Sequence, residues 1–346
     1  MSEGFHFSID DFIDELERRR GAELAFRAKN REEWILWRSR LRAKLFELMA
    51  PLPLPTPMKP RVVESVEQGG LVRHKVVYTT EAGVDAAALL FLPKSASKSK
   101  PVPGVVALHG HGTGKDDVSG TAAEPSGHND YGLQFAERGY AVIAPDARGF
   151  GERSEGFGRP APGETTGRYG TRDPCNVSFL RTMLFGISLM SRNIWDDIKA
   201  MDYLSSLPEV DPDRIACVGL SFGGTRAMYL SAIDPRIKVV VISGYLTTFA
   251  EYALRMGNFC GSQFLPGIYR YADVADVTAS IAPRPLLIEA GVRDPGFPIA
   301  ASREAHAVLE RAYEVAGARD RLDRDEFDGE HQFSGRKAFD FVAKWL

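Results

Sequence analysis

Two kinds of hydrophobic spacing divide the chain at about residue 60. Before this point apolar side chains recur at helical spacing, first within residues 8–20 and then from about Arg31 to Ala50. The second stretch carries one apolar stripe, formed by Trp34, Trp37, Leu41, Leu45 and Leu48. Five prolines between Pro51 and Pro60 then fix an extended connector. We therefore expect residues 1–60 to form an N-terminal helical extension with a proline-rich strap, whose second helix packs on the remaining chain.

After residue 60 the pattern becomes that of strands and then of alternating strands and helices. Two strand-like runs flank Gly69-Gly70, which predicts a hairpin. The expected strands are Arg61–Gln68, Leu71–Thr79, Val84–Leu92, Gly104–Leu108, Tyr140–Ala144, Ile215–Val218, Lys238–Ser243, Pro285–Ala290 and Asp325–Asp328. The expected helices are Gly132–Arg138, Ile194–Leu207, Gly223–Ala232, Ile299–Ala316 and Ser334–Leu346. This order predicts an α/β protein with a mostly parallel central sheet, antiparallel N-terminal strands and helices on both faces.

Two segments interrupt this alternation within the domain expected over residues 61–346. Residues 147–190 are rich in glycine and arginine, and residues 244–280 carry seven tyrosine and phenylalanine side chains. Both segments follow predicted strands, so we expect both insertions to lie over the carboxyl ends of the sheet, where open α/β folds bind ligands.

The segment Gly219-Leu-Ser-Phe-Gly-Gly224 is the strongest chemical signal. It joins a predicted buried strand to a predicted helix, and a serine on such a sharp turn has its hydroxyl exposed. Small residues two positions before and after the serine are needed because the turn packs closely. We therefore expect Ser221 to be a nucleophile, against the alternative of an ordinary glycine-rich turn.

A serine nucleophile needs a base and an acid, which follow it along the chain in this architecture. Of the two histidines after Ser221, His306 lies within a predicted helix, whereas His331 lies in a loop between the last strand and the last helix. We expect His331 to be the base. Asp294, in the turn after the strand Pro285–Ala290, is the expected acid, with Asp273 and Asp276 as competitors.

An acyl-transfer site also needs hydrogen-bond donors for the oxyanion. One is the backbone N–H of Phe222, directly after the nucleophile, and the other is expected from His111 in the His109-Gly-His-Gly112 segment after a predicted strand. The two histidines could also suggest a metal site, but no carboxylate or cysteine pattern accompanies them. We therefore expect neither a metal nor a cofactor.

Together these residues resemble the α/β-hydrolase superfamily over about residues 62–346. Within it the chain is similar to the branch of dienelactone hydrolases and acetyl xylan esterases (cephalosporin-C deacetylases). The similarity rests on Leu108–Gly112, on Pro145–Ser154 and on Asn193–Asp197. Those deacetylases typically carry glutamine where this chain has Phe150 and Phe222, and dienelactone hydrolases use a cysteine nucleophile where this chain has Ser221. The resemblance implies an α/β-hydrolase fold and leaves the substrate open.

The composition limits which binding partners and which cellular compartment we expect. The net charge is −3, which offers little attraction to nucleic acid or to an anionic membrane, and no apolar run is long enough to span a bilayer. Three widely spaced cysteines and the absence of a signal-peptide pattern favour a reducing, cytoplasmic location. We expect a small-molecule ester as the partner, and the helical stripe leaves a homo-oligomer open.

The expected function is that of a serine carboxylic-ester hydrolase with a Ser221–His331–Asp294 triad. Phe150, Phe222 and the aromatic side chains between Tyr245 and Tyr271 are expected to narrow the pocket. The glycines and arginines of 147–190 are expected to give it a polar rim. Both features favour short, acetyl-like acyl groups. An oligopeptidase-like serine peptidase and a non-catalytic scaffold of the same fold are the alternatives.

Overall fold

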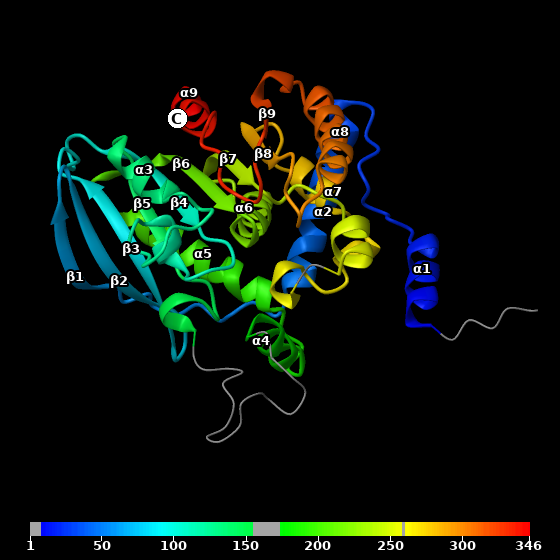
Figure 1. The fold of residues 1–346 in the computed structure, drawn as a ribbon, viewed down its shortest axis with the longest axis horizontal. Helices are drawn as coiled ribbons and strands as arrows, with labels where there is room; N and C mark the ends of the chain where they lie inside the picture. The colour runs from blue at the N-terminus through cyan, green and yellow to red at the C-terminus, as the bar shows by residue number, and fades with distance from the viewer. Residues whose placement is uncertain (1–7, 155–173, 258–259) are drawn as a thin grey trace, which may run out of the picture.

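A twisted sheet forms the centre of the computed structural model, which describes residues 8–154, 174–257 and 260–346 (Figure 1). Nine strands follow one another across the described sheet in the order β1-β2-β3-β5-β4-β6-β7-β8-β9. Their bounds are β1 Arg61–Gln68, β2 Leu71–Glu81, β3 Val84–Pro93, β4 Val102–Leu108, β5 Ala141–Pro145, β6 Val210–Leu220, β7 Ile237–Ser243, β8 Leu286–Gly291 and β9 Leu322–Phe327. The strands β1, β2, β3 and β5 pair antiparallel, and all pairs from β5 to β9 are parallel. The mostly parallel sheet with antiparallel N-terminal strands is confirmed.

Helices cover both faces of the sheet, which confirms the α/β class. The α-helices are α1 Ile9–Arg19, α2 Arg31–Met49, α3 Tyr131–Glu137, α4 Pro174–Met183, α5 Leu189–Ser206, α6 Phe222–Ile233, α7 Val274–Ala279, α8 Ile299–Val315 and α9 Ala338–Trp345. Shorter helical turns are η1 Lys115–Val118, η2 Gly151–Arg153, η3 Ala250–Arg255, η4 Gly261–Gln263, η5 Ile268–Arg270 and η6 Arg319–Arg321. Helices α3 and α9 share one apolar cluster with the sheet, and α2, α5, α6 and α8 share the other.

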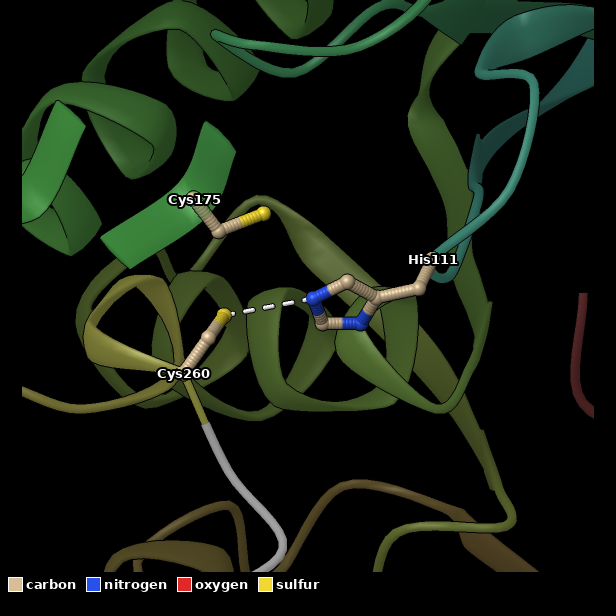
Figure 2. A group of neighbouring side chains, drawn as sticks. All are labelled: His111, Cys175 and Cys260. Atoms are coloured by element: carbon tan, nitrogen blue, oxygen red, sulfur yellow. Dashed lines mark hydrogen bonds between the residues drawn. The ribbon is translucent and has the colours of Figure 1, made fainter. Parts of the chain in front are cut away.

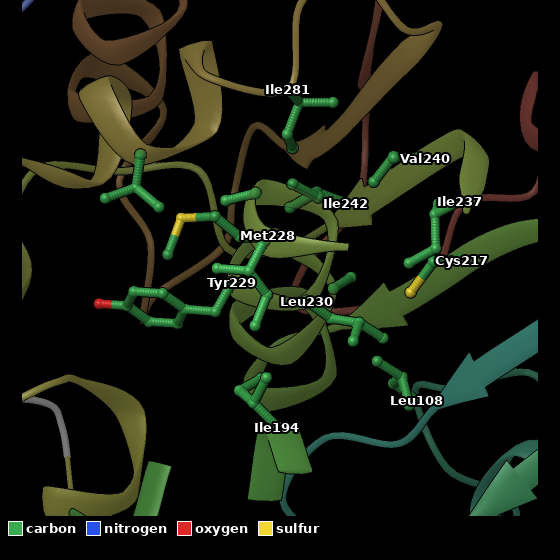
Figure 3. Packing of buried hydrophobic residues seen from close by; sticks show 14 of the residues in the cluster. Leu108, Ile194, Cys217, Met228, Tyr229, Leu230, Ile237, Val240, Ile242 and Ile281 are labelled. Atoms are coloured by element: carbon green, nitrogen blue, oxygen red, sulfur yellow. The ribbon is translucent and has the colours of Figure 1, made fainter. Parts of the chain in front are cut away.

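The central parallel strands are buried on both faces. Each of the residues Ile215–Val218 of β6 has no exposed surface, which explains why this strand is a continuous apolar run rather than an alternating one. Figure 3 shows how α6 packs on this face, with Met228 and Leu230 directed at the same apolar layer as Ile194 of α5 and Ile242 of β7. This apolar layer packs on β6, the strand that ends directly before the predicted nucleophile, Ser221.

The last helix differs from its prediction. It begins at Ala338 rather than at Ser334, because Gly335 has a left-handed φ of 67°, which a right-handed helix does not contain. Helices α4 and α7 lie within the two insertions and were not predicted, since neither has a long apolar repeat.

The two N-terminal helices differ in how much of their surface is buried. In α2 the side chains of Trp34, Trp37, Leu41 and Leu45 are buried, with Met49 rather than Leu48 completing the stripe. No residue of α1 is buried, and Figure 1 shows this helix standing away from the sheet. No helix within the described ranges is long and apolar enough to cross a membrane.

Candidate active site

Ser221 occupies a strained turn between β6 and α6. Its backbone has φ 57° and ψ −122°, a left-handed region that non-glycine residues rarely adopt. The turn is held by the Ser221 N–H, which donates to the Ser243 carbonyl of β7 at 2.9 Å. Side chains cannot be added at the flanking glycines, since a Cβ on Gly223 would lie 1.7 Å from the Leu108 carbonyl oxygen. The spacing seen in the sequence therefore reflects close packing of this turn against β4.

His331 and Asp294 meet at the same end of the sheet. Nδ1 of His331 lies 2.6 Å from Oδ2 of Asp294, and Oδ1 of Asp294 accepts the N–H groups of Gly296 and Phe297 at 2.8 and 3.1 Å. With Asp294 as acceptor, Nδ1 carries the proton and Nε2 is left as an acceptor. The Phe297 ring stacks on the imidazole at 5.3 Å between centroids. Both the tautomer and the orientation of the His331 ring are thereby fixed.

The other carboxylates and histidine considered from the sequence have different partners. Asp273 accepts the Phe249 N–H, and Asp276 accepts the Phe26 N–H and the Asp273 N–H, so both stabilise loops and the start of α7. Burial raises the pKa of Asp273 to about 6. His306 lies on α8 beside Glu310, as expected for an ordinary helix residue.

Gly110 brings the loop after β4 close to the nucleophile. A Cβ added at Gly110 would lie 3.0 Å from the Ser221 Cβ, so only glycine fits there. The next residue, His111, lines the same cavity as Ser221. Within the described residues, neither the His111 nor the Phe222 backbone N–H donates a hydrogen bond, which leaves both free for an oxyanion.

His128 is a residue near the site that the sequence did not reveal. Its Nε2 accepts the Gly110 N–H at 2.7 Å, and its Nδ1 lies 2.9 Å from the Ser126 hydroxyl. Burial lowers the pKa of His128 to about 4, so the ring is neutral near pH 7 and can accept this hydrogen bond. His128 thus fixes the loop that carries His111. Its sequence environment, a polar segment before α3, gave no signal of this contact.

A cavity of about 750 Å³ opens over these residues. Its walls include Ser221, His331, His111 and side chains of the second insertion and of the turn after β8, which are Tyr252, Met256, Gly257, Cys260, Gln263, Pro295, Gly296 and Phe297. The cavity therefore joins the expected nucleophile, base and oxyanion loop in one space at the carboxyl end of the sheet.

The prediction of which side chains line the pocket is partly wrong. Phe150 and Phe222 do not line the cavity; both are buried behind the His111 ring, each with its centroid 5.4 Å from it. Of the arginines expected on a polar rim, Arg148 and Arg153 turn inward to the buried Asp196 carboxylate. Phe259, Arg159, Arg168 and Arg172, together with the glycines of 155–173, lie outside the described residues.

The segments that carry the family resemblance form one buried polar network. The Arg148 side chain donates to both Asp196 carboxylate oxygens at 2.8 and 2.9 Å, and the Arg148 N–H donates to Asn193 at 2.9 Å. One residue further along α5, Asp197 pairs with Arg226 of α6, and both side chains are buried. The network ties the loop after β5 to the helix that follows the nucleophile.

Glu289 supports the loop that carries His331. This carboxyl is buried on β8 and accepts the N–H groups of Ser334 and Gly335 at 3.2 and 3.1 Å. Burial raises its pKa to about 7. Glu289 therefore holds the loop that carries the expected base and does not contact the base itself.

One further group of side chains borders the cavity. Nε2 of His111 lies 3.2 Å from Sγ of Cys260, and Cys175 of α4 lies close to both (Figure 2). Hydrogen bonds with Cys175 and His111 lower the pKa of the Cys260 thiol to about 5. His109, in contrast, is fully buried, and its Nε2 accepts the Ala147 N–H at 3.0 Å.

Comparison with known proteins places the chain in a family. A sequence profile described as "Abhydrolase family" matches residues 2–338, which includes the N-terminal extension that the earlier resemblance left out. The "Putative hydrolase YtaP" of Bacillus subtilis (strain 168) is 26% identical over 321 residues, covering 89% of this chain and 100% of that protein.

Solved structures share the fold at low sequence identity. A structure titled as a "putative acetyl xylan esterase" from Bacteroides fragilis NCTC 9343 has a TM-score of 0.79 at 20% identity, covering 94% of this chain and 84% of that one. A glucuronoyl esterase from Solibacter usitatus has a TM-score of 0.64 at 17% identity, covering 94% and 97% of the two chains. The resemblance to α/β-hydrolases is therefore confirmed, and the chain belongs to the Abhydrolase family.

Proposed function

We propose that this protein is a serine carboxylic-ester hydrolase that acts through Ser221, His331 and Asp294. The observation that carries the proposal is the 2.6 Å contact between His331 and Asp294 in a cavity that Ser221 also lines. A strained serine turn, a histidine with a fixed tautomer and a buried carboxylate are the parts that acyl transfer to serine requires.

The proposed reaction has two halves, and the first forms an acyl-serine. Nε2 of His331 takes the Ser221 hydroxyl proton while Oγ attacks the ester carbonyl. The resulting oxyanion accepts the N–H groups of His111 and Phe222. Asp294 stays ionised and stabilises the imidazolium through Nδ1–H. The imidazolium then gives its Nε2 proton to the alkoxide leaving group, which departs as an alcohol and leaves an acyl-serine.

The second half repeats these steps with water. His331 takes a proton from water as the hydroxide attacks the acyl carbonyl, and the same two N–H groups hold the second oxyanion. Collapse of this intermediate releases the acid and returns the proton to Ser221. No step needs a cofactor.

We further propose a preference for acetyl and similarly short acyl groups. Support comes from the aromatic walls formed by Tyr252 and Phe297 and from the acetyl xylan esterase title of a structural relative. The proposal includes a cytoplasmic location, supported by the three cysteines, none of which forms a disulfide in the described structure. It also includes a division into an extension (1–60) and a catalytic domain (61–346).

The test is hydrolysis of p-nitrophenyl esters from acetate to palmitate by the wild-type chain and by Ser221→Ala. The variant should lose about three or more orders of magnitude in kcat. Each methylene that finds an apolar wall is worth about 0.8 kcal/mol, so a long acyl site would show kcat/KM rising with chain length. A maximum at acetate to butyrate supports the short-acyl site. A maximum at octanoate or longer contradicts it, and unchanged activity in Ser221→Ala contradicts the serine mechanism itself.

A further inference from the structure

Three soft donor atoms meet at the edge of the cavity. Nε2 of His111, Sγ of Cys175 and Sγ of Cys260 all lie within 4.8 Å of one another, and Figure 2 shows the three side chains turned toward a common space. They come from the loop after β4, the start of α4 and the segment before η4. We propose that these three side chains bind one zinc ion.

The distances suit a tetrahedral ion. Zn–S bonds of about 2.3 Å and Zn–N bonds of about 2.0 Å place neighbouring donors roughly 3.5–3.8 Å apart. The His111 and Cys260 donors are already 3.2 Å apart, so even the widest pair permitted by the 4.8 Å limit needs to approach by only about 1 Å. Small side-chain rotations supply such a shift without moving the backbone.

The chemistry of the three donor atoms indicates which metal ion they would bind. Two thiolates and an imidazole favour zinc and similar soft or borderline cations, whereas magnesium and calcium require oxygen ligands. On binding, each cysteine that still carries a proton exchanges its S–H bond for a Zn–S bond, and that proton passes to the solvent. His111 and Cys260 also line the cavity that contains Ser221, so the proposed zinc site borders that cavity.

This ligand set differs from the histidine pair considered in the sequence. His109 is excluded because its buried Nε2 already accepts the Ala147 N–H. The two cysteines come from different insertions and lie 85 residues apart, so no local spacing revealed them. Bound zinc would join both insertions to the loop of His111.

The proposal concerns binding and is independent of the ester hydrolase activity. Cobalt(II) is the probe, added to the full-length chain kept reduced by a phosphine. The wild-type chain should bind one cobalt ion and show thiolate-to-cobalt charge-transfer absorption in the near ultraviolet. Cys175→Ser and Cys260→Ser should each lose most of that absorption. Cys217→Ala, which removes a thiol buried in β6, and Ser221→Ala should keep it.

Thermal unfolding with zinc gives a second readout. Free zinc at roughly one hundred times its dissociation constant should raise the wild-type Tm by about 5 °C and leave the Tm of folded Cys175→Ser/Cys260→Ser unchanged. The proposal is overturned if the wild-type chain shows no thiolate-to-cobalt absorption. It is also overturned if Cys175→Ser and Cys260→Ser both keep that absorption. A Cys175–Cys260 disulfide that forms in air, in a chain whose reduced form takes up no cobalt, also overturns it.

Discussion

Asp294 controls the tautomer of His331. Its Oδ2 accepts a hydrogen bond from Nδ1–H, and its Oδ1 accepts hydrogen bonds from two backbone N–H groups. In Asp294→Asn the amide can turn its oxygen toward the two N–H groups and its NH₂ toward Nδ1. This favours the wrong tautomer, with the proton on Nε2. We expect kcat for ester hydrolysis to fall by about 10³–10⁴ with the fold unchanged.

Asp276→Asn is the matched control for that loss. Asp276 is also a buried carboxylate that accepts backbone N–H groups, but its partners are Phe26 and Asp273 rather than the base. This variant should unfold at a lower temperature and keep its kcat. If Asp276→Asn loses as much turnover as Asp294→Asn, the assignment of the acid is wrong.

Glu289 makes the stability of the fold depend on pH. Its pKa is about 7 in the folded chain against an ordinary value of 4.5, so the folded state holds more of this proton between those pH values. The stabilising contribution is therefore complete below pH 4.5 and is lost as the pH rises through 7. Glu289→Gln removes this titration.

Urea unfolding of both chains at pH 5, 6, 7 and 8 measures the effect. The free energy of unfolding of the wild type relative to Glu289→Gln should decrease with rising pH, by on the order of 3 kcal/mol in total. Since His128 and His306 titrate in both chains, the difference isolates Glu289. A difference that stays constant from pH 5 to 8 would show that Glu289 is ionised throughout.

Helix α2 joins the N-terminal extension to the rest of the protein, because its buried side chains belong to the same apolar cluster as those of α5, α6 and α8. Trp37 is buried, its Nε1–H donates to the Leu24 carbonyl at 2.8 Å, and its ring meets the Phe26 ring edge-on at 4.8 Å. On the other side of the helix, Leu36 is 61% exposed. Trp37→Ala should therefore destabilise the protein by about 3–5 kcal/mol, and Leu36→Ala should change stability by less than about 0.5 kcal/mol. Urea unfolding measures the free energy of unfolding of both variants. Equal values for Trp37→Ala and Leu36→Ala would contradict the packing of Trp37.

Elements with a strong local pattern could be predicted from the sequence, and those fixed by distant contacts could not. Helix α2 follows from its apolar repeat, and strand β6 follows from its continuous apolar run. The start of α9 could not be predicted, because the left-handed φ of Gly335 ends any helix before it, and this turn is held by Glu289 on β8, which is distant in sequence.

In the candidate site too, residues marked by a local pattern could be predicted, and residues placed by distant contacts could not. Ser221, Asp294 and His331 stand out because each follows a strand whose end lies at one edge of the sheet. The side chains of Asp294 and His331 are in contact and Ser221 lines the same cavity as His331, while the catalytic roles of all three are proposals. Phe150 was misplaced because its burial depends on His109, His111 and Phe222, which only the folded chain brings around it.

At the scale of the whole molecule, the sheet brings residues from three distant parts of the chain into one cavity. The loop after β4 supplies His111, the turn after β6 supplies Ser221, and the loop after β9 supplies His331. The second insertion and the turn after β8 add the walls, so the α/β core positions the reacting groups and the connecting segments shape the space for substrate.

Covalent labelling by a fluorophosphonate tests the central claim most directly, because the reagent reacts with a serine only when a base and oxyanion donors activate it. Mass spectrometry of the wild-type chain should find one phosphonyl group, located on the peptide that contains Ser221. Ser221→Ala should stay unlabelled, and Asp294→Asn should react much more slowly. A folded wild-type chain that remains unlabelled, or a label on any other serine, would contradict the account and favour a non-catalytic scaffold.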